Sequence, residues 1–496
     1  MDVHIDRDST VPIYLQISGG IKEMILGGKL PEGFRLPPER RLARSLGVNR
    51  STVLAAYREL KADALVDAHV GRGTMVLPRQ PEPAPTLPTQ PIAWRQLARE
   101  GGPKAQDPLV RDLLELTERK GIISLSVGLP AAELLPLELV HRVMATLTAE
   151  VGAPLLLYSP TEGMTTFREA ICELLVARGI QCSPPEVLVT SGSQQGLDLV
   201  ARVFLEPGDA VVVEEPSFFG ALQVFRRVPV DGEGMRTDVL EALLARQRPK
   251  LIYTLPTFQN PSGTVMSLAR RRHLLELAYR FQVPVLEDDP YAELRYDGAP
   301  LPSLAALDQR EHVLYLSSFS KVLFPGMRLG FVAAPRAAVR QLALAKQAMD
   351  LHSSTAGQFL LERFIRDGHY ARHVKTVRGH YQRRREAMDV ALRREAPAGV
   401  SWAKPTGGFY FWCRFPNTIA QARLLAKAAE RGVSYLPGDA CFASEPADNH
   451  LRLNFTFPPP DHVGEGVQRL MDAVRLLASR PRRAGGEVSD ATPPIV

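Results

Sequence analysis

A run of prolines near residue 80 divides this sequence into two parts. Residues 78–91 read PRQPEPAPTLPTQP, with six prolines in fourteen positions. Proline fixes its own φ and has no N–H to donate, so such a run forms an extended, semi-rigid spacer. We therefore expect residues 1–77 to fold apart from the rest of the chain, with the spacer extending loosely to about residue 120.

The part after the spacer alternates short apolar runs with longer segments of helical period. The runs are VLVT at 187–190, AVVVE at 210–214, LIYTL at 251–255, VPVLE at 283–287 and VLYLS at 313–317. Strands that are buried on both faces read as continuous apolar runs. The pattern predicts an α/β domain with a mainly parallel central sheet over residues 121–478. Residues 479–496 lack apolar content, so we expect a disordered tail.

Composition narrows the class of protein. The chain of 496 residues is 45% hydrophobic and carries a net charge of +6, which is too weak to indicate nucleic-acid binding by itself. The sequence contains no apolar run suited to a signal peptide or a membrane span, so we expect a cytoplasmic protein without a membrane partner. The four scattered cysteines form no CxxC pair, which favours reduced thiols over a metal site.

Residues 1–77 contain three helix-like segments and a hairpin. The first helix follows Pro12, the second ends at Gly47, and Asn49 is the expected N-cap of the third. This order is the helix-turn-helix layout. The string VGRGTMV then predicts a tight hairpin with Arg72 at its tip, placed for a minor-groove or phosphate contact.

Basic and hydroxyl side chains gather around the turn. Arg50, Ser51 and Thr52 open the third helix, from where they can reach base edges or phosphates. From Arg35 to Arg58, six basic residues accompany a single acid, which is a credible phosphate-binding footprint. The layout alone leaves a second interpretation open, a three-helix bundle with a solvated basic face.

The string LPPERRLARSLGVNRSTVLAAYREL, followed by GRGTMV, resembles the GntR-type winged helix over nearly all of residues 10–77. By that resemblance Arg40, Arg50, Thr52 and Arg72 contact DNA. One position departs from the family pattern, because Ala64 stands where glycine is usual. The departure concerns the geometry at the end of the third helix.

In the large part, polar residues follow successive apolar runs. Lys321 lies beside Ser318 after one run, where a lysine can form a Schiff base with an aldehyde while hydroxyls bind a phosphate. Arg328 can pair with that phosphate. The segment 191–196 (SGSQQG) opens a helix, and its backbone amides can form an anion site.

Two further runs end in groups suited to an aromatic heterocycle. Asp288 follows VPVLE, and a carboxylate there can hold a protonated pyridine nitrogen. Tyr291 and Asn260 can hydrogen-bond a neighbouring ring oxygen. Each piece alone is a common turn, but the ordered set of phosphate loop, Asn, Asp, Tyr, Lys and Arg indicates a site for a phosphorylated pyridine aldehyde.

With the strings SGSQQGL, EDDPY and GGFYFW, residues from about 120 to 478 resemble fold-type I aminotransferases of the aminoadipate/kynurenine branch. The resemblance implies pyridoxal 5'-phosphate as the cofactor, a smaller C-terminal α/β subdomain and a homodimer. It implies that Lys321 forms the aldimine, that Asp288 holds the pyridine nitrogen, and that Asn260 and Tyr291 hold the 3-oxygen. The residues it implies for the phosphate are Ser193, Gln194, Ser318 and Arg328.

The same resemblance implies roles for three more residues. Phe218 would stack on the ring in place of a tyrosine, which keeps the stacking and loses a hydroxyl. Tyr158 would reach the phosphate of the neighbouring subunit. Arg452 would grip the carboxylate of an amino compound through two parallel hydrogen bonds.

Both parts in this order resemble the MocR/GabR subfamily of GntR regulators. The resemblance implies a pyridoxal-phosphate-dependent regulator that binds a double-stranded DNA operator, associates with the nucleoid and senses the cofactor or an amino compound. The alternatives are an active aminotransferase with an accessory DNA-binding domain, and a cofactor-binding protein with neither output. Arg50 and Arg72 have no use in transamination, which favours the regulator.

Overall fold

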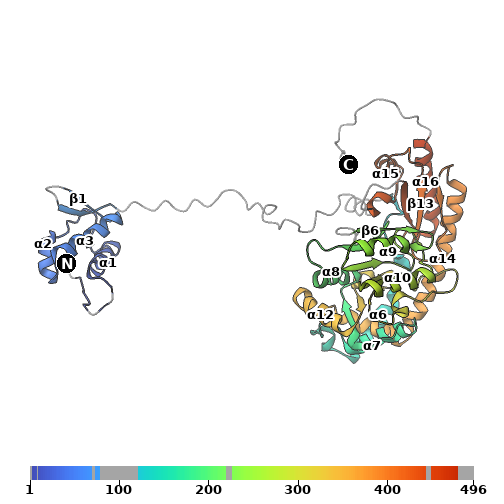
Figure 1. Ribbon diagram of the computed structural model, residues 1–496, viewed down its shortest axis with the longest axis horizontal. Helices are drawn as coiled ribbons and strands as arrows, with labels where there is room; N and C mark the ends of the chain where they lie inside the picture. Colours follow the sequence, from blue (N-terminus) through green and yellow to red (C-terminus); the bar gives the residue numbers. More distant parts are fainter. Residues whose placement is uncertain are drawn as a thin grey trace. The chain divides into compact units, whose positions relative to one another are not determined.

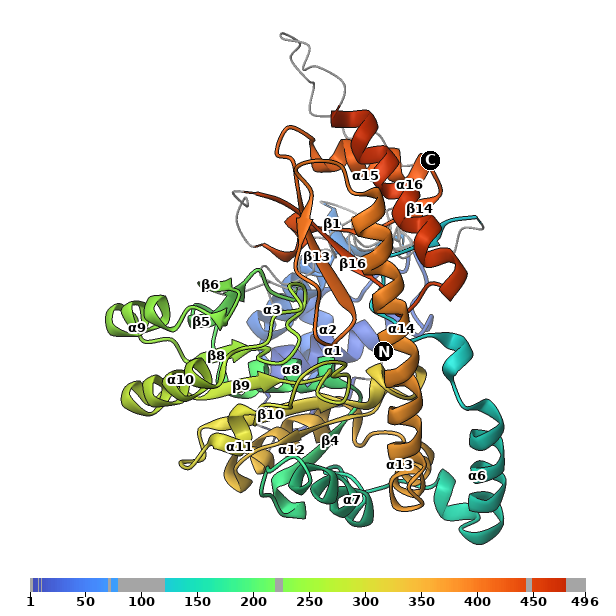
Figure 2. The same ribbon diagram turned by 90° about the vertical axis from the view of Figure 1, so that its right-hand side faces the viewer.

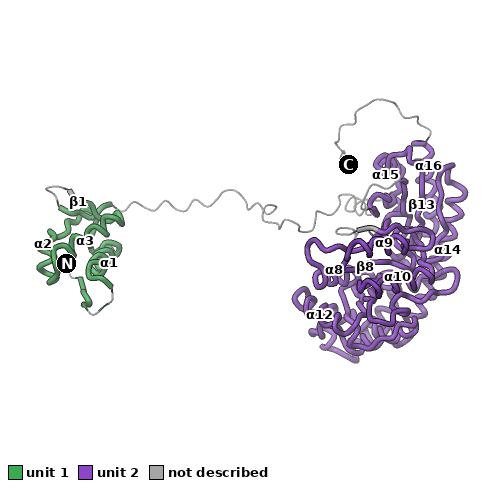
Figure 3. Tube along the Cα trace, in the orientation of Figure 1, with its two compact units in different colours: residues 1–104 green, residues 105–496 purple. Residues whose placement is uncertain are grey.

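The structure is a computed structural model, and it describes residues 3–7, 9, 11–69, 73–78, 121–218, 226–442 and 448–478. The chain divides into two compact units, Met1–Lys104 and Ala105–Val496 (Figure 3). The tip of the expected hairpin with Arg72, most of the expected spacer and the expected disordered tail lie outside the described residues.

The small unit contains three helices and a two-stranded antiparallel sheet. Its elements are α1 (Ile13–Leu26), α2 (Glu39–Leu46), α3 (Arg50–Ala62), β1 (Val66–His69) and β2 (Gly73–Val76). The strands pair from Val66↔Val76 to His69↔Gly73, so the hairpin begins earlier than the string VGRGTMV suggests. Its core is formed by apolar side chains from all five elements, among them Ile17, Leu42, Val53 and Val66.

The helix ends in this unit follow local backbone chemistry. Gly47 ends α2 in the left-handed conformation at φ 63°, as the sequence predicts. Asn49 is the N-cap residue of α3, as expected, although its side chain makes no capping hydrogen bond. Ala64 takes φ 51°, the left-handed region in which glycine is favoured.

The large unit is built on an eight-stranded sheet of order β4-β11-β10-β9-β8-β5-β6-β7 (Figure 1). Strands β10, β9, β8, β5 and β6 run parallel, whereas β11 is antiparallel to both of its neighbours and β7 is antiparallel to β6. The strands are β4 (Val187–Thr190), β5 (Val211–Glu215), β6 (Arg226–Asp231), β7 (Gly234–Met235), β8 (Leu251–Thr254), β9 (Val285–Asp288), β10 (Val313–Ser318) and β11 (Gly330–Ala333). The mainly parallel sheet predicted from the sequence is confirmed.

The central sheet is buried on both faces. Val187 and Val189 of β4 belong to one hydrophobic core, and Leu188 between them belongs to another. This alternation is the period of a strand with apolar layers on either side. The helices of the unit are α6 (Leu137–Glu150), α7 (Thr165–Val176), α8 (Ser193–Phe204), α9 (Thr237–Arg246), α10 (Leu268–Phe281), α11 (Leu304–Leu307), α12 (Arg336–Asp350), α13 (Thr355–Arg366), α14 (His369–Glu395), α15 (Gln421–Glu430) and α16 (Pro460–Ala478).

A smaller subdomain stands at the C-terminal end of the chain. Its four-stranded sheet has the order β12-β13-β16-β15, and the long helix α14 runs from beside α13 to beside α16 (Figure 2). Pairing of β13 with β16 sets Arg452 opposite Trp412. The strands outside the large sheet are β3 (Ile123–Ser124), β12 (Ser401–Trp402), β13 (Tyr410–Phe415), β14 (Val433–Ser434), β15 (Leu436–Pro437) and β16 (Asn449–Asn454).

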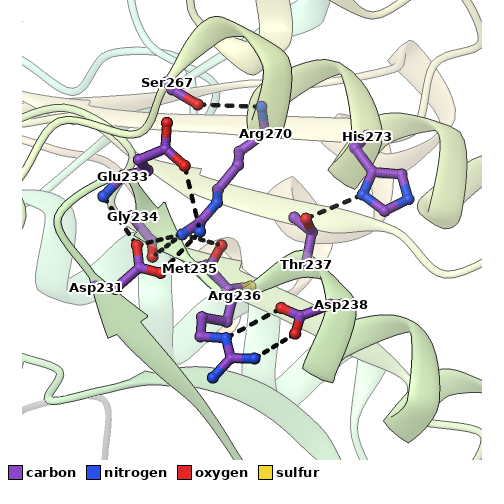
Figure 4. Close-up of polar contacts among 10 residues, drawn as sticks. All are labelled: Asp231, Glu233, Gly234, Met235, Arg236, Thr237, Asp238, Ser267, Arg270 and His273. Atoms are coloured by element: carbon purple, nitrogen blue, oxygen red, sulfur yellow. Dashed lines mark hydrogen bonds and ion pairs between the residues drawn. The ribbon is translucent and has the colours of Figure 1, made fainter.

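An ionic cluster holds the β7 edge of the large sheet against α10 (Figure 4). Arg270 of α10 pairs with both carboxylate oxygens of Asp231 and donates to the carbonyl of Gly234 at 2.8 Å. Ser267 caps the same helix by accepting from the Arg270 N–H at 3.4 Å. Because each group in this cluster has a partner at the sheet edge, we read the cluster as structural.

Candidate functional site

The sequence-predicted cofactor residues follow the C-terminal ends of strands that lie together in the large sheet. Segment 191–193 follows β4, Asn260 follows β8, Asp288 ends β9, and Lys321 follows β10. The carboxyl ends of parallel strands open on the same edge of a sheet, which is where α/β proteins bind their ligands. The fold therefore brings these residues to one edge.

Asp288 is a buried acid at this edge. It is 4% exposed, and its Oδ2 accepts from the hydroxyl of Tyr253 at 2.9 Å. Burial raises the pKa of Asp288 to about 7, against the opposing effects of the Tyr253 hydrogen bond and the nearby charge of Lys321. Its other oxygen, Oδ1, is buried without a hydrogen-bond partner among the described residues.

Lys321 lies in a 3-10 turn directly after β10. Its Nζ donates to the carbonyl of Gly128 at 2.8 Å. Burial lowers the pKa of Lys321, and Arg452 and Arg328 lower it further, while Tyr410 and Asp288 raise it. A lysine in this setting holds its proton less tightly, and its neutral amine is a nucleophile.

Arg452 reaches the same edge from the C-terminal subdomain. The side chain is 3% exposed; its Nη1 donates to Asn260 Oδ1 at 2.7 Å and its Nη2 to the carbonyl of Ser126 at 2.8 Å. Its guanidinium carbon lies 4.1 Å from the centre of the Tyr410 ring. The arginine expected to bind a carboxylate and the residue expected to bind the ring oxygen are therefore in direct contact.

Tyr410 links several of these groups. The Tyr291 hydroxyl donates to the Tyr410 hydroxyl at 3.1 Å, and both rings are buried. A Cβ at position 128 would lie 2.0 Å from the Tyr410 oxygen, so only glycine fits where the backbone meets both Tyr410 and Lys321. Tyr410 belongs to the string GGFYFW, from which no role for this residue could be predicted.

The expected phosphate end is formed by the loop before α8 and by two residues near β11. Gly192 takes φ 86°, and a Cβ there would lie 2.4 Å from Arg328 Nη2. Arg328 donates to the Ser191 carbonyl at 3.4 Å, which holds its charge over the loop. Ser318 bonds Ser320 at 2.9 Å.

Three predicted residues stand apart from these contacts. Gln194 is exposed, whereas its neighbour Gln195 bonds Asp350 at 2.7 Å. Phe218 is half-buried against the core. Tyr158 is 84% exposed and meets His352 edge-on, with the ring centres 5.4 Å apart. None of the contacts described above joins Tyr158 to another predicted cofactor residue of this chain.

The buried polar atoms at this edge fit pyridoxal phosphate. Asp288 Oδ1 and Arg452 Nε are both buried and unpartnered within the described part of the chain, and buried polar groups normally have partners. A protonated ring nitrogen would satisfy the first atom and a carboxylate the second. Sequence reasoning missed Tyr253, Tyr410, Gly128 and Ser126; the one signal for them was the position of Tyr253 inside a predicted strand.

The predicted DNA-contacting residues that the structure describes lie on α2 and at the start of α3. Arg40, Arg50 and Ser51 are exposed, and Thr52 is half-buried. Arg50 Nε donates to Glu39 Oε2 at 3.0 Å, in an ion pair between α3 and α2. Exposed arginines at the start of the second helix of a helix-turn-helix can reach the major groove.

The fold and the site define a pyridoxal-phosphate aminotransferase fold on a chain that also carries a winged helix-turn-helix. Residues 120–470 match the model of the aminotransferase class I and II family, and residues 13–76 match that of the bacterial regulatory proteins of the gntR family. The chain is 31% identical to the uncharacterized HTH-type transcriptional regulator YisV of Bacillus subtilis, over 95% of this chain and 98% of that one. It therefore belongs to the MocR-type regulators of the GntR family.

Other relatives match one or both units. The chain is 28% identical to the probable rhizopine catabolism regulatory protein MocR of Rhizobium meliloti, over 96% of each. The solved α-aminoadipate aminotransferase LysN of Thermus thermophilus, complexed with N-(5'-phosphopyridoxyl)-L-leucine, is similar at 38% identity and a TM-score of 0.73, covering 78% of this chain and 99% of that one. This protein is thus a DNA-binding regulator whose large unit uses pyridoxal phosphate.

Among the described residues, no group of three or more His, Cys, Asp and Glu side chains is arranged to hold a metal ion. None of the helices described is both long enough and apolar enough to cross a bilayer.

Proposed function

We propose that an amino compound carrying a carboxylate binds between Lys321 and Arg452 and changes the affinity of the small unit for its operator. The observation that supports this proposal is the buried pair of a lysine amine with a lowered pKa and an arginine with an unpartnered Nε. Such a pair matches a ligand with an amino group at one end and a carboxylate close by.

Each residue of the cofactor site has a separate role in this proposal. Pyridoxal phosphate supplies an aldehyde, with which a neutral amine reacts. Lys321 provides such an amine, and the Gly128 carbonyl orients it. Asp288 and Asn260 would hold the ring nitrogen and the ring oxygen, and Arg328 and Ser193 the phosphate. Arg452 would exchange its bond to Asn260 for a ligand carboxylate, which couples ligand binding to the ring-oxygen partner.

A titration of operator DNA tests the proposal. Fluorescence anisotropy on the promoter region of the protein's own gene would be measured with cofactor, and with cofactor plus each member of an amino-acid panel. We expect at least one compound to shift operator affinity. In Arg452→Gln we expect that compound to bind roughly 10- to 100-fold more weakly, because a charged hydrogen bond is lost. Operator affinity that no compound changes would contradict the proposal.

We also infer a homodimer. Leu156, Leu157 and Tyr158 are 87%, 61% and 84% exposed, and three consecutive large apolar or aromatic side chains in water favour burial against a partner. Tyr158 would then contribute to the neighbouring subunit's phosphate site. Sedimentation velocity of the full chain would show a dimer, and Leu156→Glu should shift it toward monomer; a monomeric wild type would contradict the inference.

A catalytic function is the second candidate. The chain is 40% identical to aromatic-amino-acid aminotransferase 1 of Thermococcus litoralis, over 75% of this chain and 92% of that one, and its large unit contains all the groups described above. Steady turnover of an amino acid with 2-oxoglutarate, without operator binding, would favour the enzyme. A single half-reaction that stops at the cofactor would favour the regulator.

A further inference from the structure

A second cavity opens on the large unit, beyond the end of β9. Its volume is about 660 Å³. The lining residues come from the segments after α7, β8 and β9, with Tyr315 from β10 and Arg378 from α14. None of the residues that the sequence predicts for the cofactor lines it. The cavity is therefore a separate concave site on the same unit.

Arg295 brings a positive charge to this cavity, and none of the ion pairs described for this part of the chain neutralises it. Its guanidinium carbon lies 4.8 Å from the centre of the Phe258 ring, and its hydrogen bond to the Asp297 carbonyl is long, at 3.5 Å. Among the described residues Arg295 forms no ion pair. Burial lowers the pKa of Arg295, and the neighbouring Arg271 lowers it further, whereas the nearby charge of Asp289 raises it. A half-buried cation in this position gains free energy from an anionic partner.

The other two arginines of the cavity are already paired. Arg178 bonds Glu293 at 2.5 Å, and Arg378 approaches the second oxygen of the same carboxylate at 3.5 Å. The Glu293 carboxylate is thus shared by two guanidinium groups. The imbalance leaves the Arg295 end of the cavity positive.

Asp289 adds an unpartnered polar atom to the wall. It is 3% exposed, and its Oδ2 accepts from the Tyr315 hydroxyl at 3.0 Å. Its Oδ1 is buried with no hydrogen-bond partner in the part of the chain that the structure describes. Burial raises the pKa of Asp289, against the opposing charges of Arg178 and Arg271.

We propose that this cavity binds a small molecule that presents a carboxylate or phosphate group to Arg295 on a short apolar body. Ile180, Leu301 and Tyr296 supply apolar surface for that body. The proposal does not depend on the function proposed for Lys321, because the two sites share no residue among those named for each.

The cavity also adjoins the cofactor site. A Cβ on Gly407 would lie 2.1 Å from the Phe258 ring. The Phe258 ring, over which Arg295 lies, therefore packs directly against the segment leading to Tyr410. Phe258 is itself two residues before Asn260. A ligand bound in the cavity can therefore affect the cofactor site through the packing of Phe258 against Gly407.

Calorimetric titration of the full, cofactor-loaded protein tests the proposal, with benzoate and phenyl phosphate as probes. Neither probe has an amine to react at the cofactor. Arg452→Gln removes the carboxylate-binding arginine of the cofactor site, so binding that survives this substitution is assigned elsewhere. In that background we expect Arg295→Gln to weaken the better probe by roughly tenfold or more. The two probes distinguish a carboxylate ligand from a phosphate ligand.

Arg310→Gln is the matched control. Arg310 also lies over an aromatic ring, 4.9 Å from the centre of Tyr279, but it does not line the cavity. We expect its probe affinity to equal that of the parent. The visible absorbance of the bound cofactor, unchanged in Arg295→Gln, would show that this variant is folded.

Hydrogen–deuterium exchange on the wild type gives a readout that needs no variant. Saturating probe should slow exchange in residues 289–303. The proposal is overturned if neither probe binds once Arg452 is replaced, if Arg295→Gln binds as tightly as Arg310→Gln, or if exchange in residues 289–303 does not change.

Discussion

Two arginines, one in each unit, show how differently the units present a positive charge. Arg50 has 56% of its side chain exposed and pairs with Glu39, an interaction worth at most about 1 kcal/mol at a surface. Arg452 is 3% exposed and fixed by Asn260 and Ser126. The first can leave its partner at little cost and adapt to DNA. The second is positioned in advance, so its site is selective for the geometry of its ligand.

The largest effect should come from the buried site. We expect Lys321→Ala to abolish covalent attachment of the cofactor, because the other lysine near the expected phosphate loop, Lys346, is held in an ion pair with Asp350 at 2.6 Å. The measurement is the visible absorbance of the lysine-bound cofactor, with Lys404→Ala, whose amine pairs with Glu386 at 2.6 Å, as the control. A surviving band in Lys321→Ala would show that the lysine is wrongly assigned.

The second-largest effect is a loss of folding stability with rising pH, which originates at Asp288 in the large unit. Burial raises the pKa of Asp288 to about 7, so the folded cofactor-free protein holds this proton more tightly than the unfolded chain does. The stability that this proton provides is complete below the ordinary aspartate pKa and is lost as pH rises through about 7. Asp288→Asn should lack this loss, which we expect to be roughly 2–4 kcal/mol.

Urea unfolding of the cofactor-free protein at pH 4.5 and pH 8 would measure this loss of stability. The control is Asp198→Asn, since Asp198 pairs with Arg202 on the surface at 2.6 Å. If Asp288→Asn and Asp198→Asn lose the same stability between the two pH values, Asp288 is not the group that titrates.

The exposed site should respond to salt and sequence instead. We expect Arg50→Ala to weaken operator binding by roughly 1–3 kcal/mol and to leave the cofactor absorbance unchanged. Lys61→Ala, at the far end of α3 and paired with Asp67 at 2.7 Å, should weaken binding less. Equal operator affinity for Arg50→Ala and wild type would argue against α3 as the recognition helix.

The smallest effect tests the backbone of the small unit. Ala64 takes φ 51°, a conformation that costs a residue with a Cβ about 1 kcal/mol. Ala64→Gly should therefore raise the midpoint of thermal unfolding of this unit. Ala55→Gly, inside α3, should lower it because glycine weakens a helix interior. A destabilised Ala64→Gly would mean that the strain is relieved in solution.

The sequence predicts most of the cofactor edge because each predicted group follows a strand-like run. Asp288 and Lys321 could be placed together in this way, since parallel strands end at one edge. The hydrogen bond between Arg452 and Asn260 joins positions 192 residues apart, a contact that only tertiary packing of the subdomain creates. Tyr253 reads as an ordinary core residue, because its partner is set by pairing of β8 with β9.

The small unit shows the same division. The ends of α2 and the faces of its helices follow from glycine and from apolar spacing. The pairing of Arg50 with Glu39 depends on the angle between α2 and α3, which spacing alone does not determine. The missing side-chain cap of Asn49 likewise depends on where the turn directs that side chain.

The adjacent carboxylates at the end of β9 have a consequence for chain length. Asp288 accepts a hydrogen bond from Tyr253 and lies near the charge of Lys321. Asp289 accepts one from Tyr315 and lies near the charge of Arg178 in the cavity. Successive residues of a strand point to opposite faces, so insertion or deletion of one residue would exchange the two carboxylates. A change in the number of residues in this stretch would therefore disrupt both the cofactor site and the cavity at once.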